Sequence, residues 1–393
     1  MYRESPIFAQ IMGFVPWRKF QKIIRIHGGD YHVKTLKTAV LFRVLAFAQL
    51  AQKRSLRDTV FSLNLMKTKL WHMGIRGAIS LNNLSHAMAQ RDWKIFADLG
   101  YLLIDEAQNL YKNDSYDLDL KNPVFALDST TIDLCLSLFT WADFRSKKAG
   151  IKVHTLLDTK SAIPVFIRIS AAQMHDVNIL DELKIIPGAW YVMDRGYMDF
   201  ERLFQIHTTG AKFVTRAKSN IKLKRMYSRK VDKASGFRCD QTVRLTGQRS
   251  SKFYPEKLRI IKFFDEEKNK KLIFLTNDFD QSSETIATLY KRRWQVELFF
   301  KWIKQNLHVK KFFGQTENAV RIQIWVAICT YLLVAIMRRV LKSNVQLSQL
   351  LHFFKNVPFE EMSINKALAE NFCENELQNY SEQPFLPGFL MGH

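Results

Sequence analysis

The chain has 393 residues, 47% of them hydrophobic and 13% aromatic, which is enough to bury the cores of two or three globular domains. Its formal net charge of +22 indicates a polyanionic partner, nucleic acid ahead of an acidic membrane surface. The four cysteines form no CxxC pair, which argues against structural zinc or a disulfide framework and suits a reducing cytoplasm. No hydrophobic leader is visible near the N-terminus, so no secretory signal is expected.

Residues 1–115 are predicted to be helical, with basic residues spread along them. Ser55 and Ser80 each precede an amphipathic run, as residues at the N-terminal cap of a helix do. A small basic helical domain is suited to reading DNA with a helix in the major groove. A solvated basic surface accounts for the same charges, and the sequence leaves both interpretations open.

After residue 122 the pattern changes to strands and helices. Five segments have the β-branched and aromatic content of strands: residues 124–132, 151–157, 163–169, 190–194 and 211–215. A loop is predicted between the first two of them, and helices are predicted at residues 177–183 and 200–206. The order β-β-β-α-β-α-β places Asp128 in the first strand and Asp194 at the end of the fourth.

Residues 218–278 keep the β pattern but become strongly basic, with a hairpin predicted at 258–264 and 271–276. This segment is expected to be an insertion ahead of a helix that Ser282 or Ser283 can cap. Further on, the apolar run at residues 322–337 is short for a membrane span and is predicted to be a core helix.

Residues 290–304 are predicted to form one helix that is apolar, and therefore buried, around most of its circumference, Trp294 and Leu298 included. At 100° per residue, an arc of roughly 80° holds the polar stripe of Tyr290, Arg293, Glu297, Lys301 and Lys304. Buried charges need a partner. One interpretation is an internal ion-pair network around Glu297. The other is a metal ion on Glu297, with the phenol and cations holding a phosphate backbone, and the helix by itself does not decide.

Three carboxylates stand out by their places in these elements: Asp128, Asp194 and Glu297. Together they suit Mg²⁺ or Mn²⁺ better than zinc, because no His/Cys set has the spacing of zinc ligands. Two such ions would activate water or a 3′-hydroxyl and stabilise the leaving oxygen of an in-line displacement at phosphorus.

The motifs Asp128-Ser129-Thr130, Asp194-Arg195-Gly196-Tyr197 and Tyr290-x2-Arg293-x3-Glu297-x6-Lys304 resemble those of the DDE transposases of bacterial insertion sequences. The chain is similar over nearly its whole length to the insertion-sequence-four-like group, which carries this Tyr-Arg-Glu-Lys spacing. The resemblance implies an α/β fold: a ribonuclease-H-like catalytic core interrupted by a β-rich insertion, preceded by a helical N-terminal domain and followed by C-terminal helices. The expected parts are a DNA-binding region at 1–115, a first core part at 120–217, the basic insertion at 218–278, a second core part at 279–345 and a tail at 346–393.

The implied activity is cut-and-paste transposition, in which the enzyme cleaves insertion-sequence ends and transfers the strands into target DNA. The implied catalytic residues and metal ligands are Asp128, Asp194 and Glu297, with two Mg²⁺ or Mn²⁺ ions per active site. DNA contacts are expected from Tyr290, Arg293, Lys301, Lys304, Arg195, Lys222, Lys224 and Arg225. The expected partners are double-stranded DNA, as terminal inverted repeats and target, and a second copy of the chain in a synaptic dimer. No membrane partner is expected, and the expected location is the bacterial cytoplasm, at the nucleoid.

One departure concerns relatives that cut through a hairpin intermediate, in which a tryptophan of the insertion stacks on a flipped base. The only tryptophan between Asp194 and Glu297 is Trp294, on the predicted helix. Substitutes would have to come from Tyr227, Phe237, Phe253 and Tyr254.

Other functions remain open. The chain could be a metal-dependent nuclease that cuts without joining, or a DNA-binding relative with a decayed core. An RNA-directed hydrolase is favoured least, because no RNA-recognition module is present.

Overall fold

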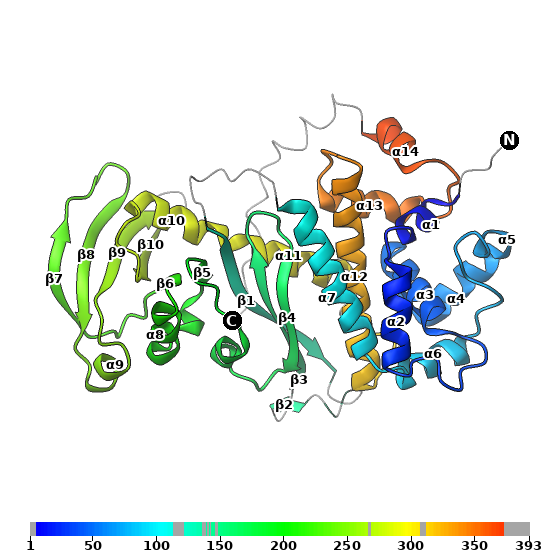
Figure 1. Ribbon diagram of the computed structural model, residues 1–393, viewed down its shortest axis with the longest axis horizontal. Helices are drawn as coiled ribbons and strands as arrows, with labels where there is room; N and C mark the ends of the chain where they lie inside the picture. The colour runs from blue at the N-terminus through cyan, green and yellow to red at the C-terminus, as the bar shows by residue number, and fades with distance from the viewer. Residues whose placement is uncertain are drawn as a thin grey trace. The chain divides into compact units, whose positions relative to one another are not determined.

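The computed structural model describes residues 5–112, 122–135, 139, 141, 143–145, 148–265, 269–306 and 312–372. The chain divides into two compact units. The first comprises Met1–Leu103 and Asn318–His393, and the second comprises Ile104–Glu317. Helices build the first unit and a mixed sheet dominates the second (Figure 1). Residues 373–393 of the predicted tail lie outside the described part of the chain.

The first unit contains helices throughout, as predicted for its N-terminal part. They are α1 (Ile7–Met12), α2 (Trp17–Ile26), α3 (Thr38–Leu50), α4 (Leu56–Leu65), α5 (Lys67–Leu70), α6 (Leu81–Gln90), most of α7 (Lys94–Tyr111), nearly all of α12 (Glu317–Val340), α13 (Leu347–Asn356) and α14 (Ile364–Asn371). The predicted capping residues are confirmed. Ser55 Oγ accepts a hydrogen bond from Asp58 N at 3.0 Å, and Ser80 Oγ accepts one from Asn83 N at 3.2 Å.

Helix α12 forms the core of this unit. Within the described residues it is the one helix that is long and apolar enough to cross a membrane, yet 94% of its apolar window is buried inside the protein. This burial agrees with the predicted core helix. Gly100 of α7 allows the close approach, since a Cβ there would lie 2.7 Å from Cε3 of the Trp325 ring. The Asn318 side chain donates to the carbonyl oxygens of Met88 and Arg91.

The ten described strands of the second unit form one sheet. They are β1 (Val124–Leu134), β2 (Asp143–Arg145), β3 (Lys148–Asp158), β4 (Pro164–Ala171), β5 (Trp190–Met193), β6 (Lys212–Arg216), β7 (Leu223–Arg229), β8 (Phe237–Leu245), β9 (Leu258–Asp265) and β10 (Lys270–Thr276). The order is β2-β3-β1-β5-β6-β10-β9-β8-β7, and β4 also pairs with β3. Strands β1, β5 and β6 are parallel neighbours, and the other pairs are antiparallel.

The five core strands and the hairpin of β9 and β10 lie where the sequence predicts them. Three details differ. The predicted loop contains the short strand β2, and the helix predicted at 177–183 is the 3₁₀ helix η2 (Asp176–Glu182). The strands of the basic segment also extend the core sheet, because β10 pairs with β6.

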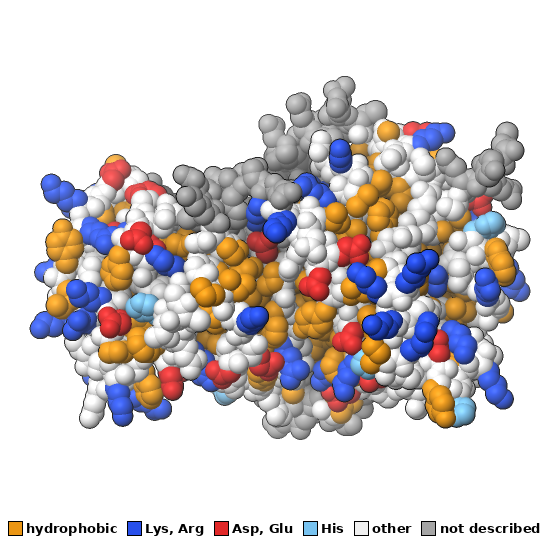
Figure 2. Space-filling view, viewed as in Figure 1, with side chains coloured by type: hydrophobic (Ala, Val, Ile, Leu, Met, Phe, Trp, Pro, Cys, Tyr) orange, Lys and Arg blue, Asp and Glu red, His pale blue; other side chains and the backbone are white. Residues whose placement is uncertain are grey.

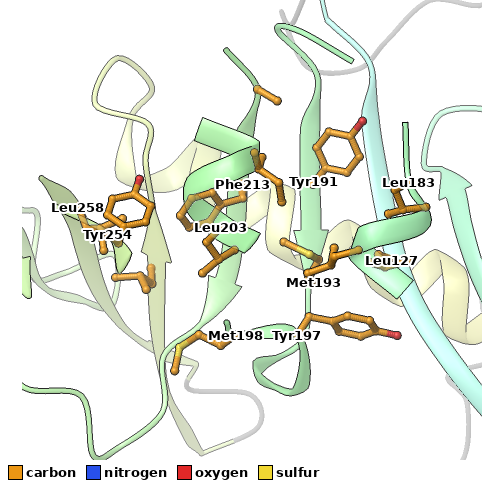
Figure 3. Packing of buried hydrophobic residues seen from close by; sticks show 14 of the residues in the cluster. Leu127, Leu183, Tyr191, Met193, Tyr197, Met198, Leu203, Phe213, Tyr254 and Leu258 are labelled. Atoms are coloured by element: carbon orange, nitrogen blue, oxygen red, sulfur yellow. The ribbon is translucent and has the colours of Figure 1, made fainter. Parts of the chain in front are cut away.

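The sheet has an apolar core on each face. On one face, Leu127 and Met193 pack with η2, with η3 (Arg195–Tyr197) and with α8 (Phe200–Thr208), as Figure 3 shows. On the other face, Val192 and Val214 pack against α10 (Ser283–Arg292). Successive side chains of a strand point to opposite faces. Asp128 and Asp194 follow Leu127 and Met193, so they are directed to the α10 face.

Candidate active site

Two of the three predicted carboxylates come from neighbouring parallel strands. Leu127 on β1 is the register partner of Met193 on β5, and Asp128 and Asp194 are the next residues along. Neighbouring strands lie about 4.8 Å apart, so the backbone brings these aspartates side by side. The carboxyl ends of parallel strands are where open α/β sheets bind their ligands.

The segment that carries Glu297 is not one continuous helix. Helix α10 ends at Arg292 and α11 (Trp294–Asn306) begins two residues later. Between them Arg293 keeps helical angles, with φ −53° and ψ −27°, and its N–H donates to Tyr290 O at 3.1 Å. The predicted burial around the circumference is also wrong, because Trp294 is 57% and Leu298 36% exposed.

The polar stripe divides into an inner and an outer part. Tyr290 is buried, stacks near Phe274 with ring centroids 5.0 Å apart, and donates from its hydroxyl to Asp194 Oδ1 at 3.4 Å. Arg293 donates from Nη1 to Asp128 Oδ2 at 2.7 Å and from Nη2 to Glu297 Oε1. The outer part, Lys301 and Lys304, is exposed. An ion-pair network therefore exists around Glu297, as the first interpretation predicts, and Lys304 takes no part in it among the described contacts. The second interpretation, with a metal ion on Glu297 and a phosphate backbone on the cations, stays a prediction.

The carboxylates act on one another electrostatically. Burial is the main cause that raises the pKa of Asp128 to about 6; the charges of Glu297 and Asp194 act in the same direction, while Arg293 and the N–H of Ser129 oppose them. Burial likewise raises the pKa of Tyr290 to about 12. For Arg293, burial lowers the pKa, but the neighbouring Tyr290, Asp128 and Glu297 outweigh it and raise the pKa overall. The site thus gathers negative charge around one guanidinium.

A polar cluster on the other face of the sheet was missed by the sequence analysis. Ser129 Oγ donates to Asp176 Oδ1 at 2.7 Å, and the same oxygen lies 3.1 Å from Lys152 Nζ and 3.8 Å from Nδ1 of the buried His154. Burial lowers the pKa of His154 to about 4. Only the register of β1 with β3 places Ser129 beside His154, and no sequence motif signals it.

The remaining predicted DNA contacts are not all near the carboxylates. Arg195 is exposed in η3, directly after Asp194. Lys222, Lys224 and Arg225 are exposed on or beside β7, which β6, β10, β9 and β8 separate from β5. These three basic residues therefore form a distinct basic edge of the sheet.

The four aromatic residues considered for base stacking differ in exposure. Tyr227 on β7 is 63% exposed, whereas Phe237 and Tyr254 are buried in the core and Phe253 is half-buried. Only an exposed ring can take a base onto its face. Of these four residues, Tyr227 is therefore the one positioned to stack on a base.

The donor set is chemically suited to a hard divalent cation, since it consists of carboxylate oxygens. The arrangement in this structure is that of an ion pair instead. Arg293 lies between Asp128 and Glu297. Among the described residues, no group of three or more His, Cys, Asp or Glu side chains is close enough to hold one metal ion. The positive charge between Asp128 and Glu297 is therefore the guanidinium of Arg293.

Comparison with known proteins decides the family. The family model for the transposase DDE domain matches residues 119–333, more than half of the chain. The chain belongs to the DDE transposases. Members of this family cleave DNA, transfer its strands and generally use divalent metal ions. A second model, a domain of unknown function (DUF4372), matches residues 3–76.

The transposase has relatives in bacteria. It is 35% identical over 261 residues to a putative transposase, y4zB, of Sinorhizobium fredii, covering 65% of this chain and 71% of that protein. It is 34% identical over 220 residues to a probable transposase for the insertion sequence element IS5377 of Geobacillus stearothermophilus, covering 55% and 57%. A cryo-EM structure of the piggyBac transposase synaptic complex with hairpin DNA aligns with 98% of this chain and 87% of that one, at 11% identity and a TM-score of 0.45. That likeness is too distant to support an inference.

Proposed function

We propose that this transposase cleaves the ends of its insertion sequence and joins them to target DNA, with Asp128, Asp194 and Glu297 as the catalytic carboxylates. The observation that supports the assignment most directly is the register that pairs Leu127 of β1 with Met193 at the end of β5, so that Asp128 and Asp194 are the next residues on neighbouring strands. Arg293 then connects Glu297 of α11 to Asp128. We assign β4, β3, β1, β5 and β6 to the ribonuclease-H-like core.

The proposed cofactor is a pair of Mg²⁺ or Mn²⁺ ions, which would activate the attacking oxygen and stabilise the leaving one. The protein's own groups position the carboxylates for this. The N–H of Ser129 donates to Asp128 Oδ1 at 2.8 Å, and the Tyr290 hydroxyl donates to Asp194. Hydrogen bonds of this kind fix the direction in which a ligand oxygen points.

The proposed partner is double-stranded DNA, bound in a synaptic dimer. In the second unit, the basic edge at β7 and the exposed Lys301 and Lys304 offer contacts to a phosphate backbone. In the first unit, α2 exposes Arg18, Lys19, Lys22 and Arg25 along one face and has no acidic residue. Figure 2 shows Lys and Arg side chains gathered over this part of the surface. We assign the reading of the terminal repeats to this helical region.

The test is cleavage of the DNA that flanks the protein's own coding region, in Mg²⁺, followed by a search for products joined to a plasmid. Asp128→Asn, Asp194→Asn and Glu297→Gln are each expected to abolish cleavage while DNA binding persists. Pairs of these substitutions should be no worse than single ones, because the three groups act as one unit. The surface change Asp181→Asn is the matched control, since Asp181 pairs only with Arg202 among the described contacts.

Two outcomes would contradict the proposal. A Glu297→Gln protein that cuts at nearly the wild-type rate removes Glu297 from the site. Cleavage without any joined product identifies a nuclease instead.

A further inference from the structure

The guanidinium of Arg293 occupies the place between two proposed metal ligands. It bonds to Asp128 Oδ2 at 2.7 Å and to Glu297 Oε1, and its side chain is only 16% exposed. Oxygens that accept these two bonds are directed at the guanidinium. The third carboxylate, Asp194, is engaged by Tyr290. This accounts for the finding that, in the described part of the chain, no cluster of carboxylates is ready to hold a metal ion.

We propose that Arg293 is a latch that blocks metal binding until DNA arrives. In the DNA-free protein the guanidinium holds Asp128 and Glu297 as an ion pair. A DNA phosphate then takes over the guanidinium, and the two carboxylates become available to the divalent cation. The inference rests on the proposed function, because it needs these carboxylates to be metal ligands.

Three features of the structure favour a phosphate as the group that opens the latch. A guanidinium binds a phosphate through two parallel N–H bonds, as it binds carboxylates. Arg293 Nε is buried without a hydrogen-bond partner, so the present arrangement leaves a donor unused. Glu297, Lys301 and Lys304 lie one turn apart along α11, so the exposed lysines can guide a DNA backbone toward Arg293.

The backbone position of Arg293 would also allow α11 to move relative to α10. It is the single residue between α10 and α11, where the regular helical hydrogen bonding is interrupted. A change at Arg293 would shift Glu297 on α11 while α10 stays packed on the sheet through Ile286 and Leu289.

The consequence is a positive coupling between DNA and metal. If DNA removes the competing guanidinium, it strengthens metal binding, and the metal must strengthen DNA binding by the same factor. A second consequence is that the DNA-free protein binds the metal weakly. The site would therefore stay without its metal, and inactive in hydrolysis, while no DNA is bound.

The experiment titrates the full-length protein with Mn²⁺ and measures free Mn²⁺ by electron paramagnetic resonance, with and without a short duplex. Without DNA, Arg293→Gln is expected to bind Mn²⁺ at least about fivefold more tightly than wild type, the lower end of typical coupling. The duplex should then strengthen Mn²⁺ binding to the wild type but have less effect on the variant. The double variant Arg293→Gln/Asp128→Asn should lose the added affinity.

Two controls separate the latch from simpler effects. Arg293→Lys keeps the charge but replaces the planar, two-pronged guanidinium with a shorter side chain that ends in a single ammonium. It should therefore hold Asp128 and Glu297 together less well and bind Mn²⁺ more tightly than wild type; a pure charge effect would leave it like wild type. Arg202→Gln breaks a forked guanidinium–carboxylate pair with Asp181, with bonds of 2.8 and 2.6 Å, on the surface of the same unit. It should leave Mn²⁺ binding unchanged. Circular dichroism melts check that the variants fold. If Arg293→Gln does not fold, the Mn²⁺ affinity of Arg293→Lys and the effect of the duplex on Mn²⁺ binding by the wild type test the latch instead.

The outcomes distinguish this inference from the proposed function. Equal Mn²⁺ affinities of wild type, Arg293→Gln and Arg293→Lys without DNA overturn the latch and leave the metal site intact. No Mn²⁺ binding that depends on Asp128, with or without DNA, overturns the metal site itself.

Discussion

Asp128 is held in an environment of opposing effects. It lies within β1, an interior strand of the sheet, with its side chain 19% exposed, beside two other carboxylates and against one guanidinium. Desolvation and like charges favour the protonated acid, whereas Arg293 and the Ser129 N–H favour the anion. A carboxylate balanced in this way is easily shifted between the two forms by a cation that arrives or leaves.

This balance predicts a pH dependence of the metal-free protein. The pKa of Asp128 is raised from 3.8 to about 6, so folding favours its protonated form. Its contribution to stability is therefore complete below about pH 4 and is lost as the pH rises through about 6, a change of about 3 kcal/mol for roughly two pKa units. Relative to wild type, Asp128→Asn should gain about this much between pH 4 and pH 7.

The measurement is urea unfolding with a chelator at both pH values. Asp181→Asn is the control, because hydrogen bonding to Arg202 lowers the pKa of Asp181, and it should show no gain as the pH rises. A difference between Asp128→Asn and wild type that stays constant across this range contradicts the placement of Asp128.

Lys304 tests the outer end of the polar stripe. It is exposed, and no ion pair ties it to Glu297 among the described contacts. Lys304→Ala should therefore lower the melting temperature only slightly. Because a lysine at this position can reach a phosphate, DNA binding or cleavage should fall by about tenfold, equivalent to about 1.4 kcal/mol. Lys184→Ala, at an exposed lysine after η2, is the control. A large loss of stability with activity per folded molecule preserved would place Lys304 in a structural network.

At the scale of elements, the sequence predicts those strands and helix ends that local residue patterns determine. The strands around Asp128 and Asp194 and the Ser282 cap, whose hydroxyl accepts from Thr285 N at 3.1 Å, follow from alternation and capping residues. The pairing of strands that are distant in the sequence does not follow from such local patterns. Nothing local shows that β10 joins β6, or that Ser129 lies beside His154. The break at Arg293 also escaped prediction, because the apolar pattern continues across it and one of the two carboxylates that hold its side chain, Asp128, lies on a distant strand.

Strand β7 is the element on which backbone binding can be tested. It forms one end of the sheet, and its exposed residues include Lys224 and Arg225, with Lys222 just before it. Substituting glutamine for all three should weaken binding to terminal and random DNA alike. The slope of log K against log salt should fall by about 0.9 for each phosphate that the protein no longer neutralises. Fluorescence anisotropy over a salt series measures this, and a weakening confined to terminal DNA would instead make β7 a reader of sequence.

At the scale of the whole molecule, the net charge of +22 makes attraction to any DNA unavoidable, so selectivity needs a dedicated surface. The helical unit cannot be tested by truncation. Residues 1–103 share one compact unit with α12, whose apolar side chains they help to bury. Deleting them would expose Trp325 and its neighbours and produce an aggregating protein whatever the role of the unit.

Substitutions on α2 avoid this difficulty. Arg18, Lys22 and Arg25 are exposed, while Phe20 and Ile24 on the opposite side hold the helix in the core. Changing the three cations to glutamine should leave the melting temperature nearly unchanged, because no described ion pair is broken. If this unit reads the terminal repeats, the ratio of affinities for terminal and random DNA should fall toward one, whereas cleavage of a pre-nicked or saturating substrate should persist.

The matched control for α2 is Lys342, Lys355 and Lys366 changed to glutamine, which removes the same charge from exposed positions of the same unit. The two triple variants therefore have equal net charge, so any long-range attraction to DNA falls equally in both. Only the α2 variant should lose the preference for terminal DNA. If both variants keep the preference, the repeats are read by another surface. If both lose it in parallel, the effect belongs to net charge, and α2 has no special role.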